Sequence, residues 1–111
     1  MTHEHGIIGH FDVTGPELES LSAFYTGVLG WEVTPRGPGY AQLTTPQLNG
    51  ALAETPEPSL TIGVVVEDLD EALARTVKMG GAVVMPATDN GWVTKAAVKD
   101  PAGNTVTLIQ K

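Results

Sequence analysis

The feature that most constrains the fold is an internal repeat. Shifting the chain by 51 residues matches three pairs of residues, Leu18 with Leu69, Gly30 with Gly81 and Val33 with Val84. The matched positions fall where a helix would begin, where it would end, and on the strand that follows, as expected of a repeated structural unit. With 111 residues, the chain fits a single domain, residues 1–111, made of two modules, residues 6–54 and 59–111.

Hydrophobic periodicity predicts the same order of elements in each module, one strand, a helix and three further strands. We expect helices over residues 16–29 and 68–79. Pro16 suits the first turn of a helix, and Gly30 suits the residue after the last turn, where positive φ is common. The sequence therefore predicts an α+β fold, in which two tandem βαβββ modules form an eight-stranded sheet cup with helices on its outer side.

Alternation along a strand predicts which side chains face the inside of the cup. In the first strand Phe11 and Val13 fall on one face, and His10 and Asp12 fall on the other. The fifth strand divides in the same way, with Ile62, Val64 and Val66 toward the helix and Thr61, Gly63 and Val65 toward the cup. Ligand contacts are thus expected from the second face of each strand.

Charge and cysteine content restrict the partners. Thirteen acidic residues against six basic ones give a net charge of −7, which repels nucleic-acid phosphates and favours a neutral or cationic ligand. No cysteine is present, which excludes disulfides and thiolate chemistry. We also expect no membrane partner and a cytoplasmic location, because no apolar run is long enough to cross a bilayer and the start "MTHEHG" lacks signal-peptide features.

Three segments carry a family likeness: "HFDVTGPELESLSAFYTGVLGWEV", "VVVEDLDEALARTVKMGGAVV" and "DPAGNTVTLIQ". Together they resemble the vicinal oxygen chelate superfamily, which includes glyoxalase I, extradiol dioxygenases, fosfomycin-resistance enzymes and bleomycin-binding proteins. The resemblance covers nearly the whole chain. It implies paired βαβββ modules, often in a homodimer, and in the enzymatic branches a divalent metal held by His, Glu and Gln side chains.

The resemblance also implies where metal ligands would lie. His10 matches the first of these positions, but Thr61 and Thr107 stand at positions usually held by histidine and glutamate. Neutral hydroxyls are poor substitutes for imidazole and carboxylate ligands of first-row divalent metals. We therefore expect neither a metal site nor a cofactor. A displaced site made of His10, Asp12 and Glu54 remains an alternative.

The histidines allow more than one interpretation. His10 can be an inward-facing residue that hydrogen-bonds a neighbour or a ligand, or it can act as a general base together with Asp12. We favour the first role, because an isolated histidine without a known orienting partner is weak evidence for catalysis. His3 and His5 are expected to be disordered and solvent-facing, because they lie near a terminus.

The two tryptophans differ in context. Trp31 follows the first helix, and we expect it to pack in the core or at a dimer interface. Trp92 follows the loop-like stretch "TDNG" and is expected to begin the seventh strand. There it can stack on a flat ligand or simply pack, and Tyr40 is a further candidate for ligand contact.

These inferences predict a metal-independent protein that binds a small organic molecule, neutral or cationic and aromatic, and functions as a homodimer. It would sequester an antibiotic or a hydrophobic metabolite. The expected ligand contacts are His10, Asp12, Tyr40, Thr61, Gly63, Trp92 and Thr107. No catalytic residue is assigned. Two alternatives stay open: an enzyme of the same superfamily, with a relocated metal or a metal-free site at His10 and Asp12, and an accessory or regulatory domain.

Overall fold

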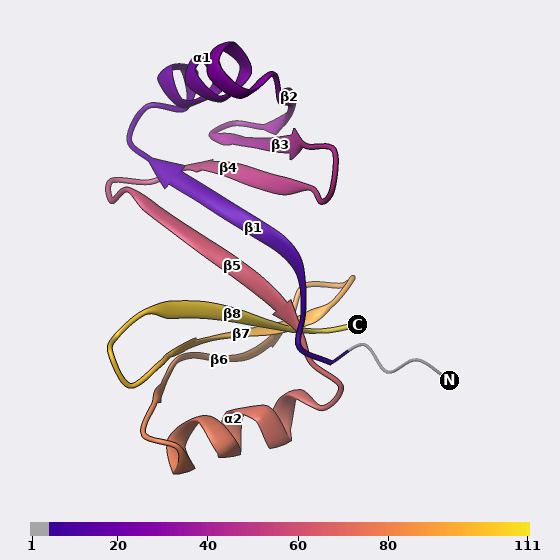
Figure 1. Cartoon of the computed structure of the whole chain (residues 1–111), viewed down its shortest axis with the longest axis vertical. Helices are drawn as coiled ribbons and strands as arrows, with labels where there is room; N and C mark the ends of the chain where they lie inside the picture. Colours follow the sequence, from indigo (N-terminus) through magenta and orange to yellow (C-terminus); the bar gives the residue numbers. More distant parts are fainter. Residues whose placement is uncertain (1–4) are drawn as a thin grey trace. The chain divides into compact units, whose positions relative to one another are not determined.

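The chain forms two compact units. The computed structural model describes residues 5–111. His10–Thr61 make up one compact unit, called the first unit below. Ile62–Lys111, together with residues 5–9, make up the second unit. Each unit contains one helix, and Figure 1 labels the elements along the chain.

The first unit has its helix between the first two of its strands. Its elements are β1 (Ile7–Gly15), α1 (Leu18–Leu29), β2 (Glu32–Gly37), β3 (Tyr40–Thr44) and β4 (Gly50–Glu54). The strands lie in the order β2-β3-β4-β1. β1 runs parallel to β4, and the other neighbouring pairs are antiparallel.

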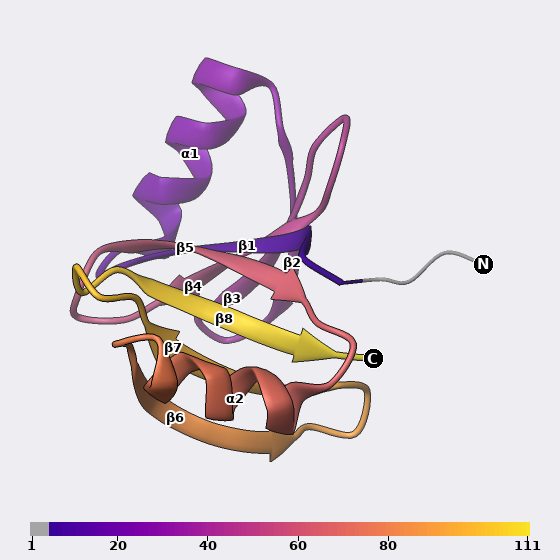
Figure 2. The ribbon, with the colours of Figure 1, turned by 60° about the horizontal axis from the view of Figure 1, so that its bottom comes forward.

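The second unit repeats this arrangement, and Figure 2 brings its helix α2 to the front of the view. Its elements are β5 (Ser59–Val65), α2 (Leu69–Lys78), β6 (Ala82–Asp89), β7 (Thr94–Lys99) and β8 (Thr105–Gln110). The strands lie in the order β5-β8-β7-β6, with β5 parallel to β8 and the rest antiparallel. The predicted fold class is confirmed: α+β, with eight strands in two βαβββ modules.

The core of the first unit lies between α1 and one face of its sheet. Its buried residues are Val13, Ala41, Leu43 and Leu52, and the half-buried side chains of Phe11, Leu18, Leu21, Tyr25, Trp31 and Val33 pack around them. The ring of Trp31 lies 5.5 Å from that of Phe11 and stacks on Tyr25 at 5.6 Å. Core packing of Trp31 and the placement of Phe11 and Val13 on one face of β1 are confirmed.

Aliphatic side chains alone build the core of the second unit. It contains Val66, Leu69, Ala96, Val98 and Leu108, with Val64, Ala72, Leu73 and Val106 packed against them. Val64 and Val66 therefore face α2 as predicted. The same prediction is wrong for Ile62, which is 39% exposed. The reason is that α2 packs mainly against β6 and β7 and contacts the β5–β8 side of the sheet less.

The two helices begin in different ways. α1 begins at Leu18, two residues after the predicted start, because Glu17 has extended backbone angles and Glu54 Oε2 accepts the Leu18 N–H at 3.1 Å. α2 begins at Leu69, where the side chain of Asp68 accepts the Glu71 N–H at 3.1 Å. The predicted helix ends agree within two residues. Within residues 5–111, no helix is long and apolar enough to span a membrane.

Candidate functional site

The face of the first-unit sheet that points away from α1 carries most of the polar side chains of its strands. Strand register places Asp12, Ala51, Gln42 and Thr34 in one row across this face. Thr14, Ala53 and Tyr40 form the next row. His10 lies on the same face, because side chains alternate along β1. We call this surface the polar face. On it, β4 contributes only Ala51 and Ala53, and the neighbouring strands β1 and β3 contribute polar groups on either side of them.

His10 and Asp12 contact each other on the polar face. His10 Nε2 lies 3.1 Å from Asp12 Oδ1, and the two side chains are 35% and 36% exposed. With the proton on Nε2, the carboxylate accepts this hydrogen bond and the lone pair of Nδ1 remains available as a proton acceptor. The pair can therefore bind a ligand by hydrogen bonds, or hold an imidazole in the orientation that a general base requires.

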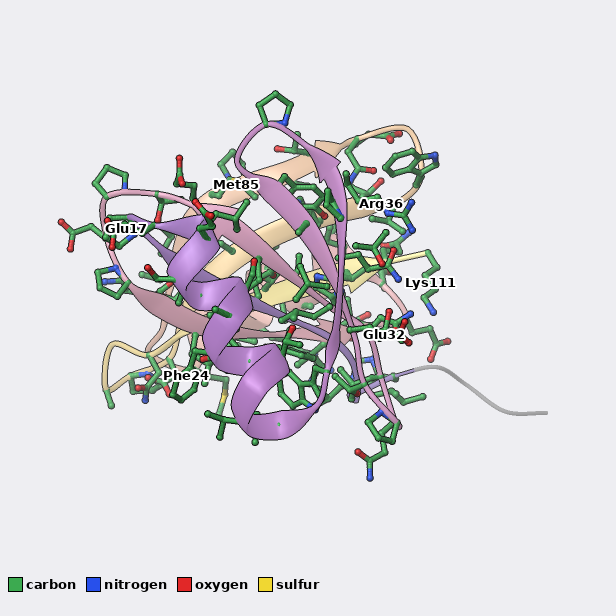
Figure 3. All side chains as sticks on the ribbon, turned by 90° about the horizontal axis from the view of Figure 1, so that it is seen from above. Glu17, Phe24, Glu32, Arg36, Met85 and Lys111 are labelled. Carbon is green, nitrogen blue, oxygen red and sulfur yellow. The ribbon has the colours of Figure 1, made fainter. Side chains whose placement is uncertain are left out.

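Across the alanine strand, Gln42 fixes an arginine. Arg36 donates to Gln42 Oε1 from Nε at 3.2 Å and from Nη2 at 2.8 Å. Figure 3 labels Arg36, which belongs to β2. It is the one basic residue in the stretch 10–61, which contains six acidic residues. The polar face thus combines a histidine–carboxylate pair with a single guanidinium in a mainly acidic unit.

The structure pairs two of the predicted contact residues in the second unit. Gly63 on β5 lies opposite Thr107 on β8, on the sheet face that points away from α2. Thr61 lies two residues earlier on β5 and is half-buried. Alternation along β5 places Thr61 and Gly63 on one face, as predicted. Their role in ligand contact remains a prediction.

Trp92 lies in the loop between β6 and β7, and β7 begins only at Thr94, so the prediction that Trp92 begins the seventh strand is wrong. Asn90 Oδ1 accepts the N–H groups of Trp92 and Val93, both at 3.0 Å, and this turn delays the strand. Trp92 is 90% exposed, and Tyr40 at the start of β3 is 46% exposed. Both rings are accessible, and stacking on a ligand remains a prediction for each.

The predicted disorder of His5 is also wrong. Its Nδ1 accepts the Glu67 N–H at 3.1 Å, which holds His5 against the segment that leads into α2. This bond joins residues 62 positions apart, so local sequence could not reveal it. His3 lies outside the described residues.

The side chains present do not fit a divalent metal. Thr61 and Thr107 supply only neutral hydroxyls at the positions where the family resemblance implies ligands. The displaced site is wrong as well, because Glu54 lies on the α1 side of β4, opposite to Asp12, and caps α1. In the described part of the chain, no group of three or more His, Asp and Glu side chains could hold a metal ion.

Sequence reasoning missed Gln42, Arg36 and Ala51 as parts of the polar face. Alternation in "GYAQLTT" already places Tyr40 and Gln42 on one face of a strand. The pairing that brings Gln42 opposite Ala51, and Ala51 opposite Asp12, depends on register. Register between strands distant in sequence is set by tertiary packing, so these residues had no sufficient local signal.

Comparison with known proteins relates this chain to others of the same fold. The model of the glyoxalase/bleomycin resistance protein/dioxygenase superfamily matches residues 7–108. The Mycobacterium bovis protein named "Putative glyoxylase CFP32" is 29% identical over an alignment 124 positions long, which covers 97% of this chain and 47% of that protein. The chain thus spans about half the length of the curated relatives it matches.

Two solved structures show the likeness in three dimensions. A superfamily member from Vibrio splendidus 12B01 has a TM-score of 0.73 at 16% identity, over 91% of this chain and 96% of that one. The Mn(II)-bound glyoxalase from Novosphingobium aromaticivorans has a TM-score of 0.73 at 16% identity, over 96% of this chain and 39% of that one. These structures show the shared fold, and the family match over residues 7–108 establishes that this chain belongs to the glyoxalase/bleomycin resistance protein/dioxygenase superfamily.

Proposed function

We propose that this protein binds a small organic molecule on the polar face without a metal ion, and that it functions by sequestering that molecule. The contact between His10 and Asp12 carries the proposal, because it places a half-exposed hydrogen-bonding pair beside a strand of small side chains. Ala51, which is buried, and Ala53, which is half-buried, carry only methyl groups between the polar strands, and Tyr40 supplies an accessible ring. A few directed polar groups around a small-residue surface are typical of ligand sites.

The acidic character of the first unit supports a neutral or cationic ligand. Residues 10–61 contain six acids and one base, and that base, Arg36, is held by Gln42. An anionic guest would meet net repulsion, whereas a cationic aromatic ring would be attracted to the unit and could stack on Tyr40. This chemistry agrees with sequestration of an antibiotic or a hydrophobic metabolite in the cytoplasm.

We also propose that the protein functions as a homodimer. The exposed face of α1 carries Phe24, Val28 and Leu29, which are 54%, 63% and 50% exposed, and Figure 3 labels Phe24. From Ser20 to the end of α1 no side chain is charged. An exposed apolar surface free of like charges suits self-association in a chain with a net charge of −7. Sedimentation of the protein as a monomer at micromolar concentration would contradict this.

The binding proposal is tested by isothermal titration calorimetry with bleomycin and a panel of neutral and cationic aromatic compounds. We expect at least one compound to bind, and His10→Ala and Asp12→Asn to weaken it about tenfold or more, since the first removes a hydrogen-bonding group and the second removes the charge that strengthens the hydrogen bonds at the site. Asp70→Asn is the matched control, because it removes the same charge from the exposed side of α2. Equal binding by all four proteins, or no binding across the panel, would overturn the site.

One observation favours a second candidate function, a metal-free enzyme in which His10 is the general base. His10 Nε2 lies 3.1 Å from Asp12 Oδ1, so the carboxylate can hold the imidazole in the orientation that a general base needs. The discriminating measurement is the chemical identity of the bound compound after prolonged incubation with the protein. Recovery of an altered compound from the parent protein, but not from His10→Ala, would replace sequestration by catalysis.

A further inference from the structure

A groove lies beside α2 in the second unit, on the sheet face opposite to Gly63 and Thr107. It has a volume of about 820 Å³, within the range of small-molecule pockets. One stripe of the helix forms its wall: Asp68, Glu71, Ala72, Arg75, Thr76 and Met79. None of the residues predicted to contact a ligand lines it. The groove is therefore separate from the proposed ligand site.

The groove exists because α2 is held over one half of its sheet. α2 packs mainly against β6 and β7. At its end, Gly81 lies so close to the Lys99 carbonyl oxygen and to Thr76 that a side chain there would collide with both. This close approach holds the helix end on the β6–β7 side, and α2 contacts the β8 side of the sheet less.

The floor of the groove is apolar. Val98, Val106 and Leu108 from β7 and β8 line it, together with Val66, and Ala72 is the small residue in the middle of the helix wall. No polar side chain of the sheet lines this floor. Val66, Val98 and Leu108 are buried in the core, and Val106 is half-buried, so an apolar ligand body would gain hydrophobic free energy mainly by covering Val106.

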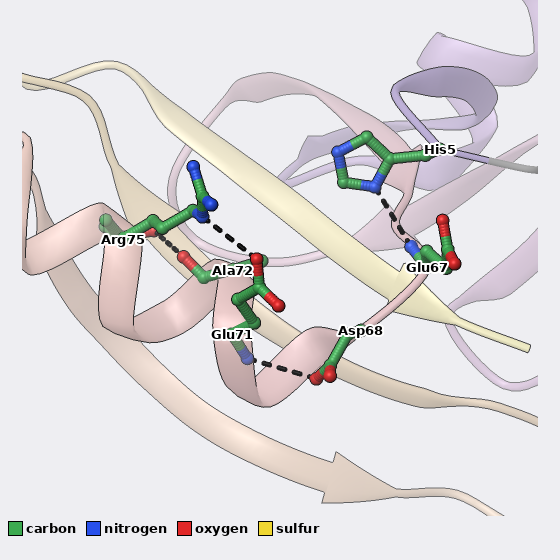
Figure 4. A network of polar contacts seen from close by, with 7 residues as sticks. His5, Glu67, Asp68, Glu71, Ala72 and Arg75 are labelled. Carbon is green, nitrogen blue, oxygen red and sulfur yellow. Dashed lines mark hydrogen bonds and ion pairs between the residues drawn. The ribbon is translucent and has the colours of Figure 1, made fainter.

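The rim of the groove is acidic, as Figure 4 shows. Glu67, Asp68 and Glu71 line it, together with the imidazole of His5 and with Arg75, whose Nε lies 3.1 Å from Glu71 Oε1. Asp68 accepts the Glu71 N–H, so its carboxylate is fixed at the start of α2. The rim carries three carboxylates against one guanidinium, and an amine entering it would be favoured over a carboxylate.

We propose that this groove is a second ligand site, which takes an amphipathic cation: an amine with an aromatic or alkyl body that lies on Val106 and Leu108 while its charged end meets Glu71. The apolar floor favours the aromatic or alkyl body of such a ligand, and the acidic rim favours its positive charge. A neutral molecule of the same shape would bind more weakly, and an anion weakest. The site lies within the second unit and needs nothing from the polar face.

The test uses three probes of matched shape: 4-phenylbutylamine, 4-phenylbutanol and 4-phenylbutyrate. Each is titrated into the 15N-labelled full chain, and amide chemical shifts are followed. We expect the amine to move the amides of Val66, Val106 and Leu108, to bind about threefold or more tighter than the alcohol, and to weaken as salt is raised. Equal affinities for amine and butyrate, or amine shifts centred on other residues, would overturn the proposal.

Two variants locate the site. Glu71→Gln leaves Arg75 without its acidic partner and should weaken the amine about threefold or more, whereas Glu19→Gln makes the same charge change on the first turn of α1 and should not. Ala72→Leu fills the groove and should weaken it about tenfold, with Ala23→Leu on exposed α1 as its control. If Ala72→Leu does not fold, the Glu71 and Glu19 variants decide. Equal effects of these two would show attraction by overall charge only and reject the site.

Discussion

The two units share an order of elements but not a kind of core. Phe11, Tyr25 and Trp31 surround the buried residues of the first unit, whereas the core of the second consists of Val, Leu and Ala. In the first unit the ring of Phe11 packs directly on Gly50: a Cβ atom on Gly50 would lie only 2.6 Å from the nearest ring carbons of Phe11. The βαβββ order therefore depends on where apolar side chains occur along the chain, and only secondarily on which ones occur.

The two helices also differ, in how their ends are stabilised. α2 carries its own signals: Asp68 as N-cap, Asp70 and Glu71 in its first turn, and Arg75 and Lys78 in its last. These charges complement the helix dipole. α1 has no side-chain cap from Glu17, and its first N–H group is accepted by Glu54 of β4. One helix is specified locally, and the other depends on the sheet beside it.

The largest expected effect concerns the aromatic core. Gly50→Ala should lower the free energy of unfolding by about 1–3 kcal/mol, because the added methyl group collides with the Phe11 ring. Gly27→Ala, in the last turn of α1 with open space around it, should raise that free energy by about 0.5–1 kcal/mol. Urea denaturation of both variants measures the difference.

The cause can be checked by combining Gly50→Ala with Phe11→Leu. With the ring removed, the methyl group should cost less than it does in the parent, so the two substitutions should not be additive. Additive losses would show that the close approach of Phe11 to Gly50 does not set the cost.

A smaller effect is expected from the helix caps. Asp68→Ala should lower the free energy of unfolding by about 1 kcal/mol, because the Glu71 N–H loses its acceptor. Glu17→Ala at the equivalent position of α1 should change it by less than about 0.5 kcal/mol, because Glu17 accepts no capping bond. Thermal unfolding followed by circular dichroism compares them. Equal losses would mean that the two helices do not differ in how they begin.

The smallest effect concerns pH. In the second unit, the Asn104 side chain and then its backbone N–H donate to Asp100 and hold the pKa of that carboxyl below its ordinary value. The lowered pKa means that the stabilisation is complete above the ordinary value and is lost as the pH falls through the folded-state pKa. The turn before β4 in the first unit, residues 45–49, contains no acid, so Asp100 has no counterpart in that turn.

The measurement is a carboxyl NMR titration of Asp100 in the parent, compared with acid unfolding of Asp100→Asn. We expect the Asp100 carboxyl to titrate with a midpoint below the ordinary pKa of an aspartate. We also expect the free energy of unfolding of Asp100→Asn to fall less than that of the parent as the pH is lowered. A midpoint at or above the ordinary value would contradict the role of Asn104.

The sequence alone was sufficient to predict the order of elements and the faces of the strands, but it was insufficient to predict contacts between segments that are distant along the chain. The 51-residue repeat located both helices within two residues, and alternation placed His10 with Asp12 and Phe11 with Val13 correctly. The errors at His5 and Glu54 share a cause, because each side chain has a partner far along the chain, whereas Ile62 is exposed because α2 lies mainly over β6 and β7. Trp92 was misplaced because Asn90 forms a turn before β7. Local periodicity reports neither register nor such partners.

Each unit contains one tryptophan, and the two have opposite surroundings. Trp31 stacks on Tyr25 in the first unit, and Trp92 of the second unit is 90% exposed. The chain therefore carries an optical reporter in each half: iodide should quench the fluorescence of Trp92 while Trp31 is shielded. With Trp92→Phe, intensity changes during unfolding report on the first unit alone, and with Trp31→Phe on the second. Comparing the two transitions would show directly whether the units unfold together or one after the other.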